Sequence, residues 1–239
     1  MATTPRPVVL VHGAFHGAWC WAALQAELDR RGVPSFAVDL PGHGASLDPL
    51  TDLHGDAAAV AGVVARLDGA VLVGHSYGGA VISQADLGGR VSHLVYLSAL
   101  TLDVGESPFS LMGTFPKRAS GGEASGGKLF QRLDDGTTGA NAALARATFY
   151  NTCSAEAAAA AQARLCPQRA STFKQEATRA NWRETPSTFI RCLQDRAISV
   201  PGQDLLAARC GSVVDLDCDH SPFVCMPSEL ADLLVPLTR

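Results

Sequence analysis

The sequence lacks several features that would indicate export, a membrane or nucleic acid. Its seven cysteines form no Cys-x-x-Cys pair, and its first residues carry no apolar run typical of a signal peptide. No apolar run is long enough to cross a bilayer. With 19 basic and 23 acidic residues the net charge is -4, so binding to nucleic acid or an anionic membrane has no electrostatic support. We therefore expect a cytoplasmic protein whose thiols are reduced.

The overall composition is typical of a globular chain. Of the 239 residues 47% are hydrophobic and 18% are charged, which excludes a disordered or collagen-like protein. A chain of this length can bury about 70% of the surface that it exposes when unfolded. It therefore needs neither a metal nor a disulfide to stabilise its core.

Short runs of β-branched and apolar residues alternate with segments of helical periodicity. Runs without polar alternation predict buried strands, at residues 8–11, 35–40, 70–73, 91–98, 188–192 and 212–216. Helices are expected between and after them, at residues 21–31, 52–67, 80–87, 204–209 and 227–237. This order is typical of the α/β class. It predicts a six-stranded, mainly parallel, doubly wound sheet with helices on both faces.

Residues 101–186 interrupt this alternation after the fourth strand. Their first part, residues 117–128, is rich in Gly, Ser and Lys, and their second part contains the five-alanine run 157–161. An insertion of this length is seldom a bare loop. We expect a mostly helical cap over the carboxyl ends of the strands, where open α/β sheets bind ligands. The core would then consist of residues 1–100 and 187–239.

The segment from Gly74 to Gly78 matches the pattern Gly-x-Ser-x-Gly and lies between a predicted strand and a predicted helix. A serine on so sharp a turn has a strained backbone, and bulky residues two positions away would clash. The turn lifts the hydroxyl of Ser76 clear of the sheet. A tight turn that merely contains a serine is the alternative, which the strand and helix on either side disfavour. The pattern predicts that Ser76 is a nucleophile.

A serine is a weak nucleophile at neutral pH and needs a base, which in turn needs an acid to orient it. His220 follows the sixth predicted strand, and a histidine on that last loop can reach a serine on a central strand. Asp195 follows the fifth strand, and Asp103, after the fourth, is the alternative acid. We favour Asp195 because its strand lies nearer the loop of His220. The resulting order is Ser76, Asp195, His220.

The loop after the first strand, residues 12–19, occupies the place of an oxyanion hole. We expect the backbone N–H groups of Ala14 and Tyr77 to hold the negative charge that develops during acyl transfer. His12 and His16 are four residues apart, but they lie on a loop with no third ligand nearby in sequence. We therefore expect no metal, and the predicted chemistry requires no cofactor.

These motifs together resemble the α/β-hydrolase superfamily, and within it the hydroxynitrile lyase/methylesterase branch and its bacterial esterase relatives. The segments that carry the resemblance are residues 8–19, 39–46, 74–79, 149–153, 195–203 and 219–223. The resemblance implies the α/β-hydrolase fold and an acid at Asp195. The lyases of this branch carry a threonine at the position of Gly13 and a lysine at the position of Ser221. Because this chain lacks both, the resemblance implies ester cleavage rather than lyase activity.

Aromatic side chains of the loop and the cap are candidates for a substrate pocket, although some would simply pack the cap. The candidates are Phe15, His16, Phe109, Phe149 and Phe223. We expect a serine hydrolase acting on a small, largely apolar carboxylic ester or lactone. The alternatives are a cofactor-free lyase, dioxygenase or cyclase-type enzyme of secondary metabolism on the same fold, or a ligand receptor without turnover. The only expected partner is the small-molecule substrate. The oligomeric state stays open, with a homodimer among the options.

Overall fold

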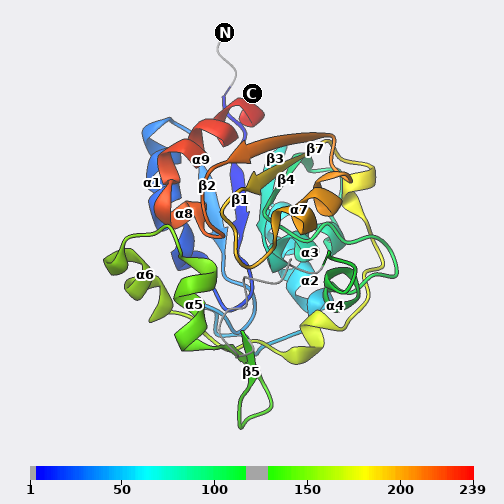
Figure 1. The fold of residues 1–239 in the computed structure, drawn as a ribbon. Helices are drawn as coiled ribbons and strands as arrows, with labels where there is room; N and C mark the ends of the chain where they lie inside the picture. The colour runs from blue at the N-terminus through cyan, green and yellow to red at the C-terminus, as the bar shows by residue number, and fades with distance from the viewer. Residues whose placement is uncertain (1–3, 117–128) are drawn as a thin grey trace.

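The computed structural model describes residues 4–116 and 129–239. Its centre is one sheet of six parallel strands in the order β2-β1-β3-β4-β7-β8 (Figure 1). The strands are β1 (Val8–Val11), β2 (Ser35–Val38), β3 (Ala70–His75), β4 (Val91–Leu97), β7 (Ser187–Cys192) and β8 (Ser212–Leu216). The predicted six-stranded α/β sheet is confirmed, and all of its neighbouring strands are parallel.

Both faces of the sheet are covered, which explains why the central strands lack polar alternation. Val8 and Leu10 pack in one apolar cluster with α1 (Ala22–Arg30) and α9 (Pro227–Leu234). Val9 and Val11 point the other way. They pack with α2 (Leu53–Val64), α3 (Tyr77–Gln84) and α7 (Val200–Ala207). β1 and β3 are buried throughout, so any side chain at their carboxyl ends has a rigid support.

Local capping determines where several helices begin, and some of these ends differ from the predicted ones. Asp52 accepts a hydrogen bond from Gly55 N at 3.1 Å and begins α2, as predicted. The helix expected from residue 204 begins at Val200, because Ser199 caps it. The helix expected from residue 80 begins at Tyr77, directly after Ser76. The last helix ends at Leu234 and continues as a 3₁₀ turn, Val235–Thr238, which contains Pro236.

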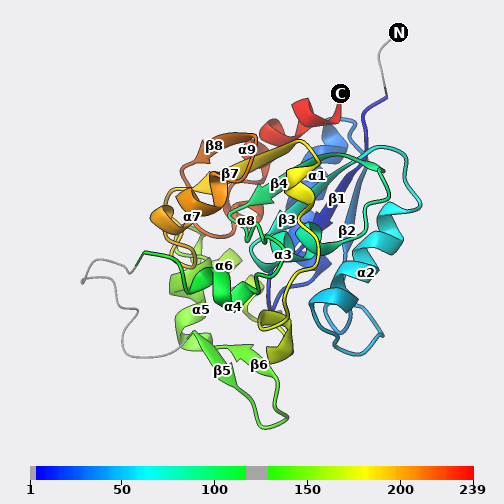
Figure 2. The same cartoon turned by 90° about the vertical axis from the view of Figure 1, so that its right-hand side faces the viewer.

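Residues 101–186 lie outside the sheet and contain both helices and a hairpin. The elements are α4 (Pro108–Met112), β5 (Phe130–Arg132), β6 (Thr138–Ala140), α5 (Ala142–Phe149) and α6 (Ala155–Gln162), with 3₁₀ turns at Ala170–Phe173 and Asn181–Arg183. The five-alanine run belongs to α6, and the Gly- and Lys-rich stretch 117–128 lies outside the described residues. α5, α6 and the hairpin lie beyond the carboxyl ends of the strands (Figures 1 and 2).

The β5–β6 hairpin was not predicted, because its strands are only three residues long. Its turn depends on Gly136, which has a φ of 81°, and on Asp135, whose carboxylate accepts from Thr137 N at 2.9 Å. The hairpin turn projects from the body of the protein (Figure 2). No helix in the described parts of the chain is long and apolar enough to cross a membrane.

Candidate active site

Ser76 is the single residue between β3 and α3, at the carboxyl edge of the sheet. Its φ of 51° and ψ of -118° are strained for a residue with a side chain. A Cβ on Gly74 would lie 2.6 Å from the carbonyl oxygen of Gly78, and one on Gly78 would lie 2.5 Å from that of Val11. Neither position has room for a side chain, so the two glycines are a steric requirement of the turn. The result is a serine at the start of a helix, next to the N–H of Tyr77.

His220 and Asp195 form a buried pair on the two loops that follow β8 and β7. His220 Nδ1 donates to Asp195 Oδ2 at 2.7 Å, and the exposed side-chain fractions are 2% and 0%. The other carboxylate oxygen accepts from the N–H groups of Ala197 at 2.6 Å and Ile198 at 2.9 Å. The hydroxyl of Ser98 also donates to Oδ2. Because Nδ1 carries the proton, Nε2 of His220 is left as a base.

Ser76 and His220 open onto one cavity of about 90 Å³ between the sheet and residues 101–186. Its lining is mostly apolar: Ala14, Phe15, His16, His75, Ser76, Tyr77, Leu100, Met112, Leu129, Phe130, Phe149, Phe173, Ala197, Ile198 and His220. Phe149 stacks on the ring of His220, with the two centroids 5.6 Å apart. No hydrogen bond joins Ser76 to His220 within the described residues.

The loop that carries Ala14 is fixed by a segment from far along the chain. Phe15 has a φ of 67°, and its N–H donates to Gln168 Oε1 at 3.2 Å. Its carbonyl oxygen accepts from Cys166 N at 2.9 Å. These bonds hold Phe15, and the N–H of Ala14 stays beside the cavity without an acceptor among the described residues. The N–H of Tyr77 likewise has no acceptor among the described residues, and both residues line the cavity.

The profile of the alpha/beta hydrolase family matches residues 8–233. The chain belongs to the α/β hydrolase family. Among relatives of this hydrolase, the pyrethroid hydrolase of Sphingobium wenxiniae is 28% identical and the match covers 97% of this chain and 87% of that protein. Norfluorocurarine synthase 2 of a Strychnos species is also 28% identical, with 99% and 97% covered.

Solved structures show the same fold. A pyrethroid hydrolase from Sphingobium faniae has a TM-score of 0.83 at 26% identity, over 98% of this chain and 97% of that one. Polyneuridine aldehyde esterase has a TM-score of 0.84 at 20% identity, over 98% and 100%. The Arabidopsis thaliana methylesterase MES16 is 36% identical over 115 residues, which is 42% of this chain and 41% of that protein. This last sequence match supports the methylesterase-like branch of the family.

In this hydrolase three of the five expected pocket residues line the cavity, and two do not. Phe15, His16 and Phe149 line the cavity. Phe109 does not: it is 42% exposed on α4 and stacks on Phe173 at 5.3 Å. Phe223 does not either, because α8 (Pro222–Cys225) turns it into the layer below, 4.7 Å from the ring of Trp21. Phe109 and Phe223 are therefore not among the residues that line this cavity, and their role in substrate binding stays a prediction.

Other lining residues of the hydrolase were not predicted as site residues. Leu100 follows β4, and Leu129 and Phe173 lie in segments far from Ser76 in sequence. No local sequence pattern shows that these segments come close to Ser76. Ala197 and Ile198 are the second and third residues after Asp195, and their N–H groups donate to its carboxylate. Because an aspartate often accepts from N–H groups at this spacing, the sequence could have identified them. Asp103, the alternative acid, pairs instead with Arg183, whose Nε lies 2.9 Å from Asp103 Oδ1.

The histidines around the site are held neutral by burial. Desolvation lowers the pKa of His12 to about 3 and that of His16 to about 4, and it also lowers the pKa of His75. His16 Nδ1 donates to Ala14 O at 2.7 Å, and its Nε2 accepts from the hydroxyl of Tyr150 at 2.7 Å. His12 is likewise bonded through both nitrogens. Neither ring has a free lone pair for a metal, and both serve to position the loop of Ala14.

Tyr77 has a buried support that the sequence did not reveal. Its hydroxyl donates to Asp56 Oδ2 at 2.7 Å, and Thr51 Oγ1 donates to Asp56 Oδ1 at 2.7 Å. Burial raises the pKa of Asp56. The bond runs from α2 to the first residue of α3, so it fixes the residue whose N–H faces the cavity.

Proposed function

We propose that this hydrolase cleaves small, largely apolar carboxylic esters through an acyl-enzyme on Ser76. The observation that carries the proposal is the buried Asp195–His220 pair, which shares one apolar cavity with a serine on a strained turn. A base in the correct tautomer beside a raised serine is the arrangement that acyl transfer requires.

Each step of the reaction has a residue in place. Ser76 Oγ attacks the ester carbonyl, and His220 Nε2 takes its proton. The N–H groups of Ala14 and Tyr77 hold the oxyanion, and Asp195 stabilises the imidazolium. The imidazolium then protonates the departing alkoxide. A water molecule, deprotonated by His220, cleaves the acyl-enzyme and restores Ser76. The hydrogen bond from Ser76 to His220 closes when the ester is bound, since such bonds are often long in free enzymes.

The size of the cavity limits the acyl group. An engineered apolar cavity of about 150 Å³ binds benzene. The cavity here is about 90 Å³, so a short aliphatic acyl group fits better than a benzoyl group. Relatives named pyrethroid hydrolase and methylesterase support ester cleavage as the reaction.

Two positions argue against cyanohydrin cleavage. A Cβ on Gly13 would lie 2.8 Å from His75 Nδ1 and 2.9 Å from Ser76 Cβ, so a threonine there has no room. Ser221 is fully buried and carries no charge. The site therefore offers neither the hydroxyl nor the cation that the resembling lyases carry. One relative is named a synthase, which keeps non-hydrolytic chemistry as the second candidate.

A panel of p-nitrophenyl esters tests the proposal. We expect kcat/KM to be highest for the acetate and butyrate and to fall for the benzoate and decanoate. Ser76→Ala should lower kcat by about 10⁴-fold, because triad residues act as a unit. Ser212→Ala, at an exposed serine on β8, is the matched control and should keep full activity. A Ser76→Ala protein that retains a tenth of the activity would contradict the mechanism.

The cysteines bear on where the reaction takes place. All seven are free, and none forms a disulfide. We propose a reducing compartment, the cytoplasm, as the location, because such thiols persist there.

A further inference from the structure

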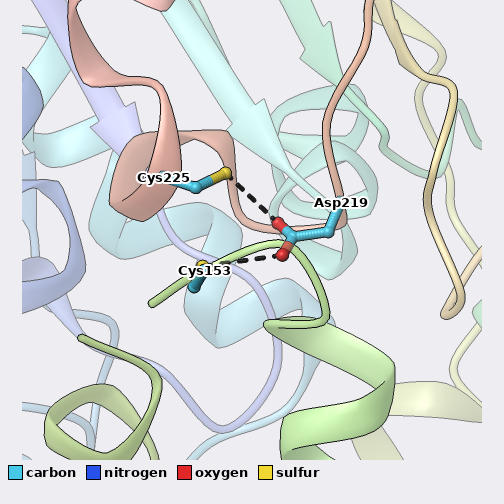
Figure 3. Close-up of side chains that lie close together, drawn as sticks. All are labelled: Cys153, Asp219 and Cys225. Carbon is cyan, nitrogen blue, oxygen red and sulfur yellow. Dashed lines mark hydrogen bonds between the residues drawn. The ribbon is translucent and has the colours of Figure 1, made fainter. Parts of the chain in front are cut away.

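Three metal-ligating side chains meet on the far side of the loop that carries His220 (Figure 3). Cys153 comes from the loop between α5 and α6, Asp219 directly precedes His220, and Cys225 ends α8. Cys153 Sγ lies 3.5 Å from Asp219 Oδ2, and Cys225 Sγ lies 3.5 Å from Asp219 Oδ1. The three ligand atoms all lie within 4.8 Å of one another. The cluster joins the segment 101–186 to the loop of the base.

These spacings match those of a tetrahedral metal site. Zinc binds thiolate sulfur at about 2.3 Å and carboxylate oxygen at about 2.1 Å, so two such ligands lie about 3.6 Å apart in a tetrahedron. The two sulfurs each lie 3.5 Å from a different oxygen of Asp219, so the carboxylate must turn to place one oxygen near both sulfurs. The Thr152 hydroxyl lies 3.6 Å from Cys225 Sγ, and the fourth position is free for water.

The chemistry of the cluster also favours a cation. Cys153 and Cys225 supply two sulfur ligands, and both thiols donate to the carboxylate of Asp219. Asp219 adds a carboxylate, and its side chain accepts from backbone N–H groups rather than from a cation. Thiolate sulfur selects soft, thiophilic ions over magnesium or calcium.

We propose that Cys153, Asp219 and Cys225 bind a thiophilic d¹⁰ cation, with Zn²⁺ as the reference ion, and that the bound ion slows ester hydrolysis. Binding displaces the thiol protons to solvent. The ion competes for the carboxylate of Asp219, whose two oxygens accept from Thr152 N at 2.7 Å and Ser221 N at 2.9 Å. Those bonds hold the loop on either side of His220, so an ion at Asp219 shifts the base relative to Ser76.

Binding is measured on the reduced, chelator-treated protein by titration with Co²⁺, followed by displacement with Zn²⁺. We expect one equivalent to bind, with a thiolate-to-cobalt charge-transfer band and the visible absorption of tetrahedral cobalt. Cys153→Ser and Cys225→Ser should each weaken binding by more than about a hundredfold, since a ligand is lost outright. Cys210→Ser, outside the cluster, is the matched control. Undiminished binding in the variant that combines Cys153→Ser with Cys225→Ser would overturn the proposal, because the ion would then be bound elsewhere.

A second measurement needs no variant and so does not depend on whether one folds. Iodoacetamide alkylation, read by mass spectrometry, should spare Cys153 and Cys225 when Zn²⁺ is present, while Cys210 labels equally with and without zinc. Equal labelling of Cys153 and Cys225 in both conditions would overturn the site.

Ester turnover is compared in the same samples. We expect zinc to lower kcat in the natural protein and Cys210→Ser, and to leave Cys225→Ser unaffected. A bound ion with unchanged turnover would refute the link to His220. Because binding is read by spectrum and alkylation, failure of the site and failure of the proposed hydrolysis are distinguishable.

Discussion

Asp195 shows how much a single carboxylate can depend on its surroundings. It accepts two backbone N–H bonds on one oxygen and the Ser98 hydroxyl and His220 on the other. These four hydrogen bonds use every lone-pair direction of the carboxylate and fix it in place although it is buried. His220 is thereby held in one tautomer with its free nitrogen on the side of the cavity.

Replacing the acid tests this arrangement. Asp195→Asn keeps the shape of the side chain but favours the wrong tautomer of His220, so we expect kcat to fall by about 10⁴-fold. Asp103→Asn removes only a contact with Arg183 and should stay within about twofold of the natural protein. Kinetics on p-nitrophenyl acetate compare the two. A larger loss in Asp103→Asn would make Asp103 the acid.

At this scale the sequence predicts residues whose pattern is local. Ser76 was predicted because two glycines flank it at fixed spacing, and Asp195 and His220 because they follow predicted strands. Ser98 and Gln168 were not, since their partners lie 97 and 153 residues away in the chain. Such contacts depend on tertiary packing, for which the sequence alone carries no periodic signal.

At the scale of elements, the loop that carries Ala14 is supported by the β5–β6 hairpin. Thr138 of β6 and Gln168 bond to each other through both backbone groups, at 2.7 and 2.8 Å. The side chain of Gln168 then accepts from Phe15 N. A hairpin that local propensity did not predict thus contributes to the position of Ala14. The sheet order and the helices over it followed from the alternating runs, because those runs report burial directly.

Removing this support should damage catalysis more than folding. In Gln168→Ala the N–H of Phe15 loses its acceptor and the loop of Ala14 loosens, so we expect kcat to fall about tenfold, less than the loss when an oxyanion donor itself is removed. Gln162→Ala is the matched control, because this half-buried glutamine at the end of α6 bonds to Ala142 O at 2.7 Å and not to the loop of Ala14. The check is kcat and KM for both variants, with thermal unfolding measured alongside. An unchanged kcat in Gln168→Ala would show that the loop holds its shape without the glutamine.

At the scale of the whole molecule, one sheet buried on both faces brings several histidines together in a space that excludes their charged form. His12, His16 and His75 are all fully buried near Ser76. Their pKa values lie below 6.5 in the folded protein and near 6.5 in the unfolded chain. Below pH 6.5 the unfolded chain therefore binds more protons than the folded one. The folded protein loses stability as the pH falls.

This linkage predicts acid sensitivity. The free energy of unfolding should fall as pH drops from about 6.5 toward about 4, by about 1.4 kcal/mol per pH unit for each buried histidine. The raised pKa values of Asp56 and Asp219 act the other way and offset part of the loss. Urea unfolding at several pH values measures the slope. A flat profile between pH 6.5 and 5 would contradict the neutral state of these histidines.

Covalent trapping identifies the nucleophile. The natural protein is treated with a fluorophosphonate, and the modified residue is located by peptide mass spectrometry. We expect one adduct per chain, on Ser76, with slower labelling in His220→Ala because the base that activates the serine is gone. An adduct on a different residue, or ester turnover that persists while Ser76 stays unmodified, would contradict the assignment of Ser76 as the nucleophile.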